Sequence, residues 1–154
     1  MTNHTITQLD TVRWVDEIDR VLKSAYAVEA ELLGVESFPP LYRDKKDILS
    51  CGNRFIGSIS DNNLCGVVEL EDPESGVTET IIASLAVAPS HFRQGIGRAL
   101  VRSVVEKEEG SFRVTTATLN QPAIELYTAQ GFELAGSFTT SDGVDMVELV
   151  FHPA

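Results

Sequence analysis

The most informative stretch of the sequence runs Val87-Ala-Pro-Ser-His-Phe-Arg-Gln-Gly-Ile-Gly-Arg98. A nearly continuous apolar run over residues 80–88 leads into it, as is typical of a strand buried on both faces. Apolar residues at helical spacing follow the glycines. The first N–H groups of a helix have no partner within the helix and add to the positive end of its dipole. The turn is therefore suited to bind a diphosphate, with Arg93 and Arg98 supplying charge-assisted hydrogen bonds.

This turn matches neither of the two common nucleotide-binding classes. A Rossmann fingerprint needs a third glycine or alanine at position 100, where the chain has Leu100, and an acidic residue about twenty positions on, where 116–119 has none. The Lys-Ser/Thr pair of a P-loop is also absent. The mismatch disfavours a nicotinamide-dinucleotide oxidoreductase.

Periodicity elsewhere predicts a single domain in which the chain order is β, α, α, three strands, then α, β, α, β, β. An amphipathic helix should begin after a cap at Asp10 or Thr11, reach Tyr26, continue toward Leu33 and end at Gly34. Hairpins in the first half and strand–helix alternation in the second indicate an α/β (α+β) fold, a mixed sheet with helices on both faces. Further expected elements are a helix at 44–49 and strands at 5–9, 54–59, 64–70, 112–117 and 145–151.

The formal net charge of the 154 residues is −11. An acidic surface repels phosphate backbones, which argues against nucleic-acid binding, and it attracts cationic substrates. No apolar run is long enough to span a membrane, and the N-terminus lacks a signal-like pattern, so we expect a cytoplasmic protein. Cys51 and Cys65 do not form a disulfide framework, and no cluster has metal-ligand spacing.

Two stretches, in order, carry a resemblance to a known family. The first is Leu85-Ala-Val-Ala-Pro89 with Arg93-Gln-Gly-Ile-Gly-Arg-Ala-Leu100, and the second is Asn120-Gln-Pro-Ala-Ile-Glu-Leu-Tyr-Thr-Ala-Gln-Gly-Phe132. They resemble the acetyl-CoA-binding motif and the following motif of the GNAT superfamily of N-acetyltransferases. The resemblance implies one GNAT-like domain over residues 1–154, with a mostly antiparallel sheet of six to seven strands.

The activity implied is transfer of an acetyl group from acetyl-CoA, as cosubstrate, to an amine of unknown identity, without a metal. The alternative is a non-catalytic CoA-binding regulatory module of the same fold. No membrane or nucleic-acid partner is expected, and a homodimer stays open because the sequence does not report oligomeric state.

The resemblance also assigns binding residues. It places the pantetheine arm along the strand end at Leu85, Ala86 and Val87. Phe92 stands where the family usually has Gln or Arg, and the arginine falls one place later. The diphosphate then lies on the turn, and the second motif contributes further contacts. The turn residues are Arg93, Gln94, Gly95, Ile96, Gly97 and Arg98, and the residues of the second motif are Asn120, Ala123 and Tyr127.

Direct attack by the amine needs an acid for the leaving thiolate and a base for the amine. Tyr127 is four residues after Ala123, on one helical face, and the resemblance makes it the candidate general acid. Relatives often carry a glutamate in the strand before the turn. Ile81 occupies its commonest position, so Glu79, two residues earlier on the same face, is the candidate base. Glu69 and Glu71 are the other candidates.

Overall fold

A computed structural model describes residues 4–35 and 38–153 of the chain. Its centre is a seven-stranded sheet in the order β1-β2-β3-β4-β5-β7-β6. Only the neighbours β4 and β5 run parallel, and the other pairs are antiparallel, so the expected mixed, mostly antiparallel sheet is confirmed. The strands are β1 (Thr5–Gln8), β2 (Arg54–Ser60), β3 (Asn63–Glu71), β4 (Glu79–Val87), β5 (Ser111–Ala117), β6 (Glu133–Thr139) and β7 (Asp145–Phe151).

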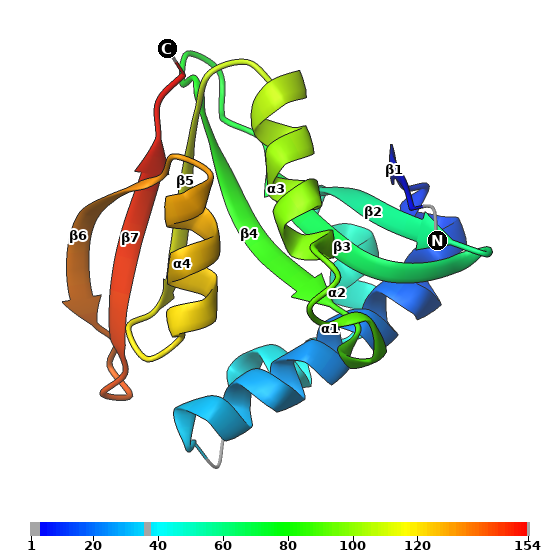
Figure 1. Ribbon diagram of the computed structural model, residues 1–154, viewed down its shortest axis with the longest axis horizontal. Coiled ribbons are helices and arrows are strands. Elements are labelled where there is room, and N and C mark those ends of the chain that lie inside the picture. The colour runs from blue at the N-terminus through cyan, green and yellow to red at the C-terminus, as the bar shows by residue number, and fades with distance from the viewer. Residues whose placement is uncertain (1–3, 36–37, 154) are drawn as a thin grey trace.

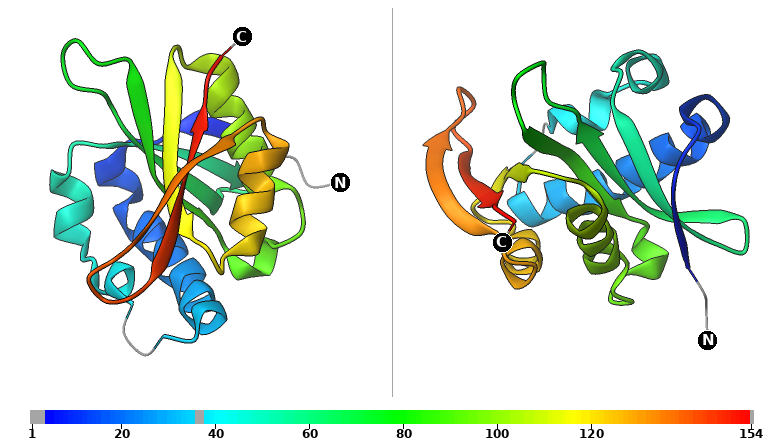
Figure 2. Two further views of the ribbon diagram at one scale, coloured as in Figure 1. Left: turned by 90° about the vertical axis from the view of Figure 1, so that its left-hand side faces the viewer. Right: turned by 90° about the horizontal axis from the view of Figure 1, so that it is seen from above.

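Helices cover both faces of the sheet, as Figure 2 shows from above. One core packs α3 and α4 against the sheet around Leu100, Phe112 and Phe132. The other packs α1 around Ile18, Val21 and residues of β2 and β3. The helices are α1 (Thr11–Leu33), α2 (Lys45–Ser50), α3 (Ile96–Lys107) and α4 (Gln121–Ala129), with short 3₁₀ turns η1 (Pro39–Tyr42) and η2 (Pro89–His91). Within the described ranges, no helix is both long and apolar enough to cross a membrane.

The boundaries of α1 follow the predicted signals. The carboxylate of Asp10 accepts hydrogen bonds from the N–H groups of Val12 and Arg13, and so caps the helix start. Gly34 ends the helix with φ of 67°, a left-handed conformation that glycine adopts at low cost. The helix therefore extends beyond Tyr26 to Leu33, as the longer of the two expected limits predicted.

The expectation that β4 is buried on both faces is wrong. Its burial alternates: Thr80, Ile82, Ser84 and Ala86 are buried, whereas Ile81 is 39% exposed. The run of apolar residues indicates a strand correctly, but a strand is buried on both faces only where packed elements cover both faces of the sheet. Ile81 is still paired with Arg113 of β5, so its exposure means that its face of the sheet is left uncovered at that point.

Strands β4 and β5 separate after a short paired stretch. Their pairing covers only Glu79–Ile82 against Ser111–Val114. On the other side of β4, Ser84 and Ile82 oppose the consecutive residues Glu69 and Leu70, so one extra residue of β4 bulges between them. A bulge bends the strand and increases its twist. Figure 1 shows β4 and β5 diverging from the end where they are paired toward α1, which crosses below the opening.

Candidate active site

A cavity of about 700 Å³ lies where β4 and β5 have separated. Residues of β4 and β5 form its inner walls, and α4 flanks it on one side. The second half of α1, η1 and the turn between β6 and β7 close the remainder. A volume of this size accommodates a drug-sized ligand. Leu85, which lines the cavity, also lies within 4.0 Å of a Cβ atom built on Gly97, so the cavity adjoins the predicted anion-binding turn.

The start of α3 differs from the starts of the other three α-helices. Asp10, Asp44 and Asn120 cap α1, α2 and α4 through their side chains. Gly95 occupies the corresponding position of α3 with φ of 78° and no side-chain hydrogen bond. Its carbonyl accepts the first helical bond, from the N–H of Ala99. The N–H groups of the first turn of α3 are therefore available to an external anion.

Two arginines flank this turn without carboxylate partners. Arg93 and Arg98 are both exposed, and neither forms an ion pair with the described part of the chain. Arg43, Arg54 and Arg113, by contrast, each pair with two carboxylates. The backbone of Arg93 is itself left-handed, with φ of 64°. Two unpaired guanidinium groups beside free N–H groups can bind phosphate.

The buried residues of the turn can contribute only through their backbone. Ile96 is buried and packs its side chain over Gly66 of β3. Gly97 is buried where α3 meets α4, and a Cβ atom there would lie 3.0 Å from Cδ1 of Leu126. Gln94 and Gly95 are exposed. The turn therefore offers an anion its backbone N–H groups, with the side chains of Arg93 and Arg98 on either side.

Of the three candidate residues on β4, Leu85 and Val87 point to one face of the sheet and Ala86 to the other. Leu85 lines the cavity, and Val87 points toward Gly97 at the start of α3. Ala86 is buried in the core against α1, so its side chain cannot reach the cavity. Beyond Ile82, however, no strand among the described residues pairs with β4 on its β5 side. Its backbone there can pair with an extended ligand chain, as a missing strand would.

The three candidates of the second motif lie together. Asn120, Ala123 and Tyr127 all line the cavity, and the Oδ1 atom of Asn120 accepts a hydrogen bond from the N–H of Ala123. The ring of Tyr127 packs against Phe132, with ring centroids 5.2 Å apart. Burial raises the pKa of Tyr127 well above its usual range, and neighbouring Tyr26 and Glu29 raise it further. The phenol therefore stays protonated at neutral pH.

A buried hydrogen-bond network that sequence reasoning did not predict lies behind the cavity wall. The hydroxyl of Tyr26 donates a hydrogen bond to Oγ of Ser84 at 2.9 Å. The hydroxyl of Ser84 in turn donates to Oε1 of Glu69 at 2.8 Å. Arg43 donates to both oxygens of Glu69 at 2.7 and 2.8 Å. Burial raises the pKa of Glu69, but the hydrogen bonds from Arg43, Asn53 and Ser84 outweigh it and leave the pKa below its usual range.

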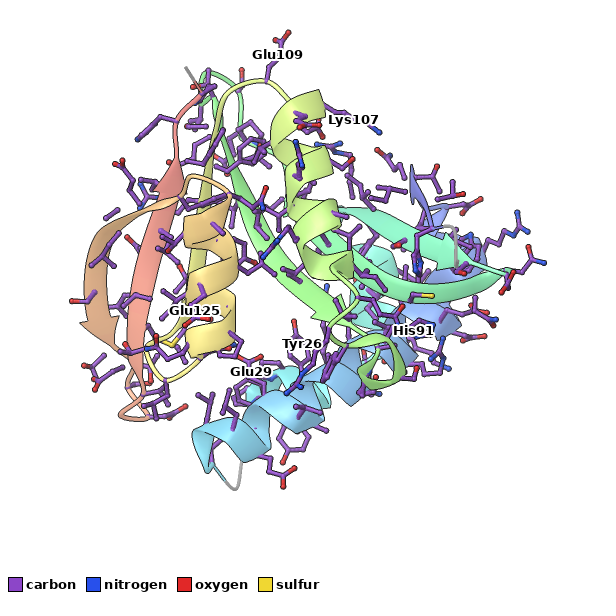
Figure 3. The ribbon with its side chains drawn as sticks, in the orientation of Figure 1. Tyr26, Glu29, His91, Lys107, Glu109 and Glu125 are labelled. Carbon is purple, nitrogen blue, oxygen red and sulfur yellow. The ribbon has the colours of Figure 1, made fainter. Side chains whose placement is uncertain are left out.

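Residues of α1 that sequence reasoning also missed line one end of the cavity. Tyr26, Glu29 and Leu33 lie there, and Figure 3 shows the first two on the part of α1 below α4. Glu29 accepts a hydrogen bond from Nδ2 of Asn120 at 3.2 Å. Their spacing of three and four residues places them on one helix face, and a glutamate within an otherwise apolar face is the signal that could have found them.

The structure does not bring the candidate base Glu79 to the cavity. Glu79 lies at the paired end of β4, opposite Ser111, and forms an ion pair with Arg113 at 2.9 Å. Arg113 also binds Glu148 at 2.9 Å. Glu71 is exposed at the end of β3, away from the cavity. Of the three carboxylates considered from the sequence, only Glu69 approaches the site, from behind its wall.

Comparison with known proteins gives a consistent family. The family model described as Acetyltransferase (GNAT) family matches residues 17–132. UPF0157 protein YqkA of Bacillus subtilis (strain 168) is 37% identical over 138 residues, which are 88% of this chain and 39% of that protein. N-acetyltransferase 8F1 of Rattus norvegicus is 35% identical over 98 residues, 59% of this chain and 44% of that protein. The chain thus spans about two fifths of the length of these relatives.

Solved structures share the fold at low identity. The ribosomal-protein-S18-alanine N-acetyltransferase from Escherichia coli aligns with a TM-score of 0.76 at 20% identity, over 97% of this chain and 94% of that one. The structure of yncA from Salmonella typhimurium with its cofactor acetyl-CoA aligns with a TM-score of 0.75 at 16% identity, over the same shares. With three quarters of its residues inside the family model, the chain belongs to the GNAT acetyltransferase family.

Proposed function

We propose that this domain transfers the acetyl group of acetyl-CoA to an amine. The observation that carries the proposal is that the uncapped, arginine-flanked start of α3 adjoins the cavity between β4 and β5 through Leu85, which lines the cavity and lies near Gly97. The diphosphate of CoA fits the first, and its thioester arm fits the second. Family membership and the acetyl-CoA bound to yncA support the same assignment.

The pantetheine arm would lie along the unpaired side of β4, beside Leu85 and Val87. The amides of the arm can form hydrogen bonds with the backbone of β4 there, as a strand would, because β5 is no longer paired with β4 beyond Ile82. Ala123 and Asn120 both line the cavity. The single methyl group of Ala123 would leave room for the arm on the α4 side, and Asn120 would contact the arm from the start of that helix. Backbone N–H groups of β4 would stabilise the oxyanion that forms on the acetyl carbonyl.

Tyr127 is the proposed general acid for the leaving thiolate. It lines the cavity on α4, and its raised pKa keeps its proton in place until the sulfur develops charge. No covalent enzyme intermediate is required, because a thioester is already an activated acyl donor. The two cysteines have no role in this scheme.

The acceptor should be a neutral or cationic amine rather than an acid-rich molecule. The net charge of −11 favours approach of cations, and raised salt should increase the KM for a cationic acceptor by screening that field. A preference for acidic acceptors at low salt would contradict this part of the proposal.

The test is thiol release from acetyl-CoA with four acceptor classes: a small alkyl amine, an amino acid, a peptide N-terminus and an amine-bearing antibiotic. Acetyl-CoA should also raise the Tm, since a ligand that binds only the folded state stabilises it by mass action. Stabilisation without thiol release for any class would favour a CoA-binding regulatory module. Absence of both effects would overturn the proposed function.

A further inference from the structure

The acceptor end of the cavity combines an aromatic wall with carboxylates. Tyr26 of α1 and Phe38 beside η1 pack edge to face with ring centroids 5.9 Å apart, and Pro39 and Pro40 continue the apolar wall. No lysine, arginine or histidine is among the described residues that line the cavity. Its two carboxylates are Glu29, within the cavity wall, and Asp142, exposed in the turn between β6 and β7.

Glu29 has hydrogen-bonding capacity to spare, unlike Glu69 on the other side of Tyr26. Glu69 is fully buried and receives hydrogen bonds from Arg43, Asn53 and Ser84. Glu29 is half-buried, receives one hydrogen bond, from Asn120, and forms no ion pair with a described residue. An ionised carboxylate can accept about four hydrogen bonds, so most of the capacity of Glu29 is open to a ligand.

Asn120 holds this carboxylate beside the proposed acid. Its Oδ1 caps α4 through the N–H of Ala123, while its Nδ2 donates to Glu29 of α1. Tyr127, on the same helix, lines the same cavity as Glu29. The charge of Glu29 contributes to the raised pKa of Tyr127. The cavity therefore presents a carboxylate from α1 and a phenol from α4 to the same space.

From this arrangement we infer that Glu29 binds the ammonium group of the acceptor and removes its proton as the general base. The inference rests on the proposed function and names the class of acceptor: a primary ammonium attached to an apolar, preferably aromatic, body. The body packs against Tyr26 and Phe38, whose ring faces also attract a cation.

The proton balance is as follows. One ammonium proton passes to a carboxylate oxygen of Glu29 and from there to solvent. The nitrogen lone pair forms the C–N bond to the acetyl carbon, the C–S bond breaks, and its electron pair leaves with sulfur. Tyr127 protonates the sulfur and is restored by the proton that the attacking nitrogen loses. The sum is an amide, CoA thiol and one released proton.

The ionisation of Glu29 fits this role. Burial raises its pKa above the usual carboxyl range, and the hydrogen bond from Asn120 offsets this in part. The groups that face it are Tyr26 on its own helix, Asn120 and Tyr127 on α4, and Asp142 across the cavity. Glu69 is fully buried and already receives hydrogen bonds from Arg43, Asn53 and Ser84, which hold its pKa below the usual range.

The kinetic test is Glu29→Gln, which preserves shape and can still accept from Asn120. With phenethylamine and acetyl-CoA, kcat/KM should fall about 10²–10⁴-fold, and the acid limb of its pH profile that belongs to Glu29 should disappear. Acetyl-CoA affinity should change less than about threefold. Glu31→Gln, an exposed glutamate on the same helix, is the control for lost charge and should match the wild type. A fall of less than about tenfold in Glu29→Gln, or an unchanged acid limb, would overturn the role of Glu29.

A binding test needs no turnover and so separates this inference from the proposed function. Calorimetry on the CoA-bound protein compares phenethylammonium with the neutral 2-phenylethanol. The wild type and Glu31→Gln should bind the ammonium at least about tenfold more tightly, and Glu29→Gln should lose that preference. A wild type without the preference, or a Glu29→Gln variant that keeps it, would overturn the inference. Thiol release that fails for every amine, with the preference intact, would overturn only the proposed catalysis.

Discussion

The two ends of the β4–β5 pair show how one pair of strands can support both structure and chemistry. At the paired end, Glu79, Arg113 and Glu148 form a mutually satisfied ion network on the sheet surface. At the open end, the backbone of β4 has no strand partner on one side, and Glu29 and the first turn of α3 have spare hydrogen-bonding capacity. Groups whose hydrogen bonds are all made stabilise the fold, and groups with capacity left can bind a ligand.

The sharpest test of the open end is Tyr127→Phe. The change removes only the hydroxyl and keeps the ring packed on Phe132, so the Tm should change little. If the phenol protonates the leaving thiolate, kcat should fall about 10²–10⁴-fold. The KM for acetyl-CoA should change much less, because the lost interaction forms mainly in the transition state.

The measurement is thiol release under conditions in which chemistry is shown to limit the rate. CoA thiolate is a tolerable leaving group, so water could replace the phenol. A loss of less than about threefold would mean that Tyr127 only packs against or positions the cosubstrate.

The carboxylate behind the cavity wall should behave as a structural group. Glu69→Gln leaves the guanidinium of Arg43 without its buried partner, although Asp47 still pairs with it. Removing one member of a buried pair typically costs about 3–5 kcal/mol, and the lower end applies here because Asp47 remains. A loss of about 3 kcal/mol corresponds to a Tm lowered by roughly 6–12 °C for a chain of this length.

The same carboxylate gives a pH dependence with a definite sign. The pKa of Glu69 is lower in the folded protein than in the unfolded chain, so its stabilising contribution is present above the ordinary carboxyl pKa. That contribution is lost as the pH falls through the folded-state pKa. Denaturant unfolding from neutral to acidic pH should therefore show a smaller loss in Glu69→Gln than in the wild type. Parallel curves would rule out Glu69 as a source of the acid sensitivity.

Arg98→Glu tests the anion site at the start of α3. Arg98 is exposed and has no described carboxylate partner, so reversing its charge should leave the fold intact. It should weaken acetyl-CoA binding about 10–100-fold, as expected for loss of a charge-assisted hydrogen bond with added repulsion. Calorimetry measures the affinity. Arg102→Glu, on the same helix beyond the first turn, is the control for reversed charge, and it also breaks an exposed ion pair with Glu106. Gly97→Glu is a poorer test, because its side chain would collide with Leu126.

The sequence predicted the features that depend on residues close together along the chain, and it missed those that depend on residues far apart. The turn at Gly95, the cap at Asn120 and the position of Tyr127 follow from residues close together in sequence, because local spacing determines them. The role of Glu29 depends on α1 crossing below the opening between β4 and β5, which local spacing does not encode. The sequence marked Glu69 as a candidate base. Its ion pair with Arg43 joins residues 26 positions apart, so local spacing did not predict that pair.

Glu79 shows how the position of a candidate residue depends on strand pairing. Alternation along the strand places it on the face of Ile81 correctly, but how far β5 stays paired with β4 determines which residues meet the cavity. That pairing ends at Ile82, three residues beyond Glu79, and nothing in the local sequence marks the end. The bulge that helps to separate the strands lies at Ala83, a residue without a turn signal.

The smallest expected effect is at this paired end. Glu79→Gln breaks an ion pair with Arg113, whose side chain is about one third exposed and keeps Glu148 as a partner. Exposed pairs contribute about 0–1 kcal/mol, so unfolding free energy should fall by no more than about 1 kcal/mol. kcat/KM should stay within about twofold of the wild type, since the carboxylate does not line the cavity. Thiol release and denaturant unfolding of the same preparation measure both. A fall in kcat/KM comparable to that expected for Glu29→Gln, with the fold intact, would indicate that Glu79 is the general base. It would also contradict the proposal that the paired end of β4 and β5 is structural and the open end catalytic.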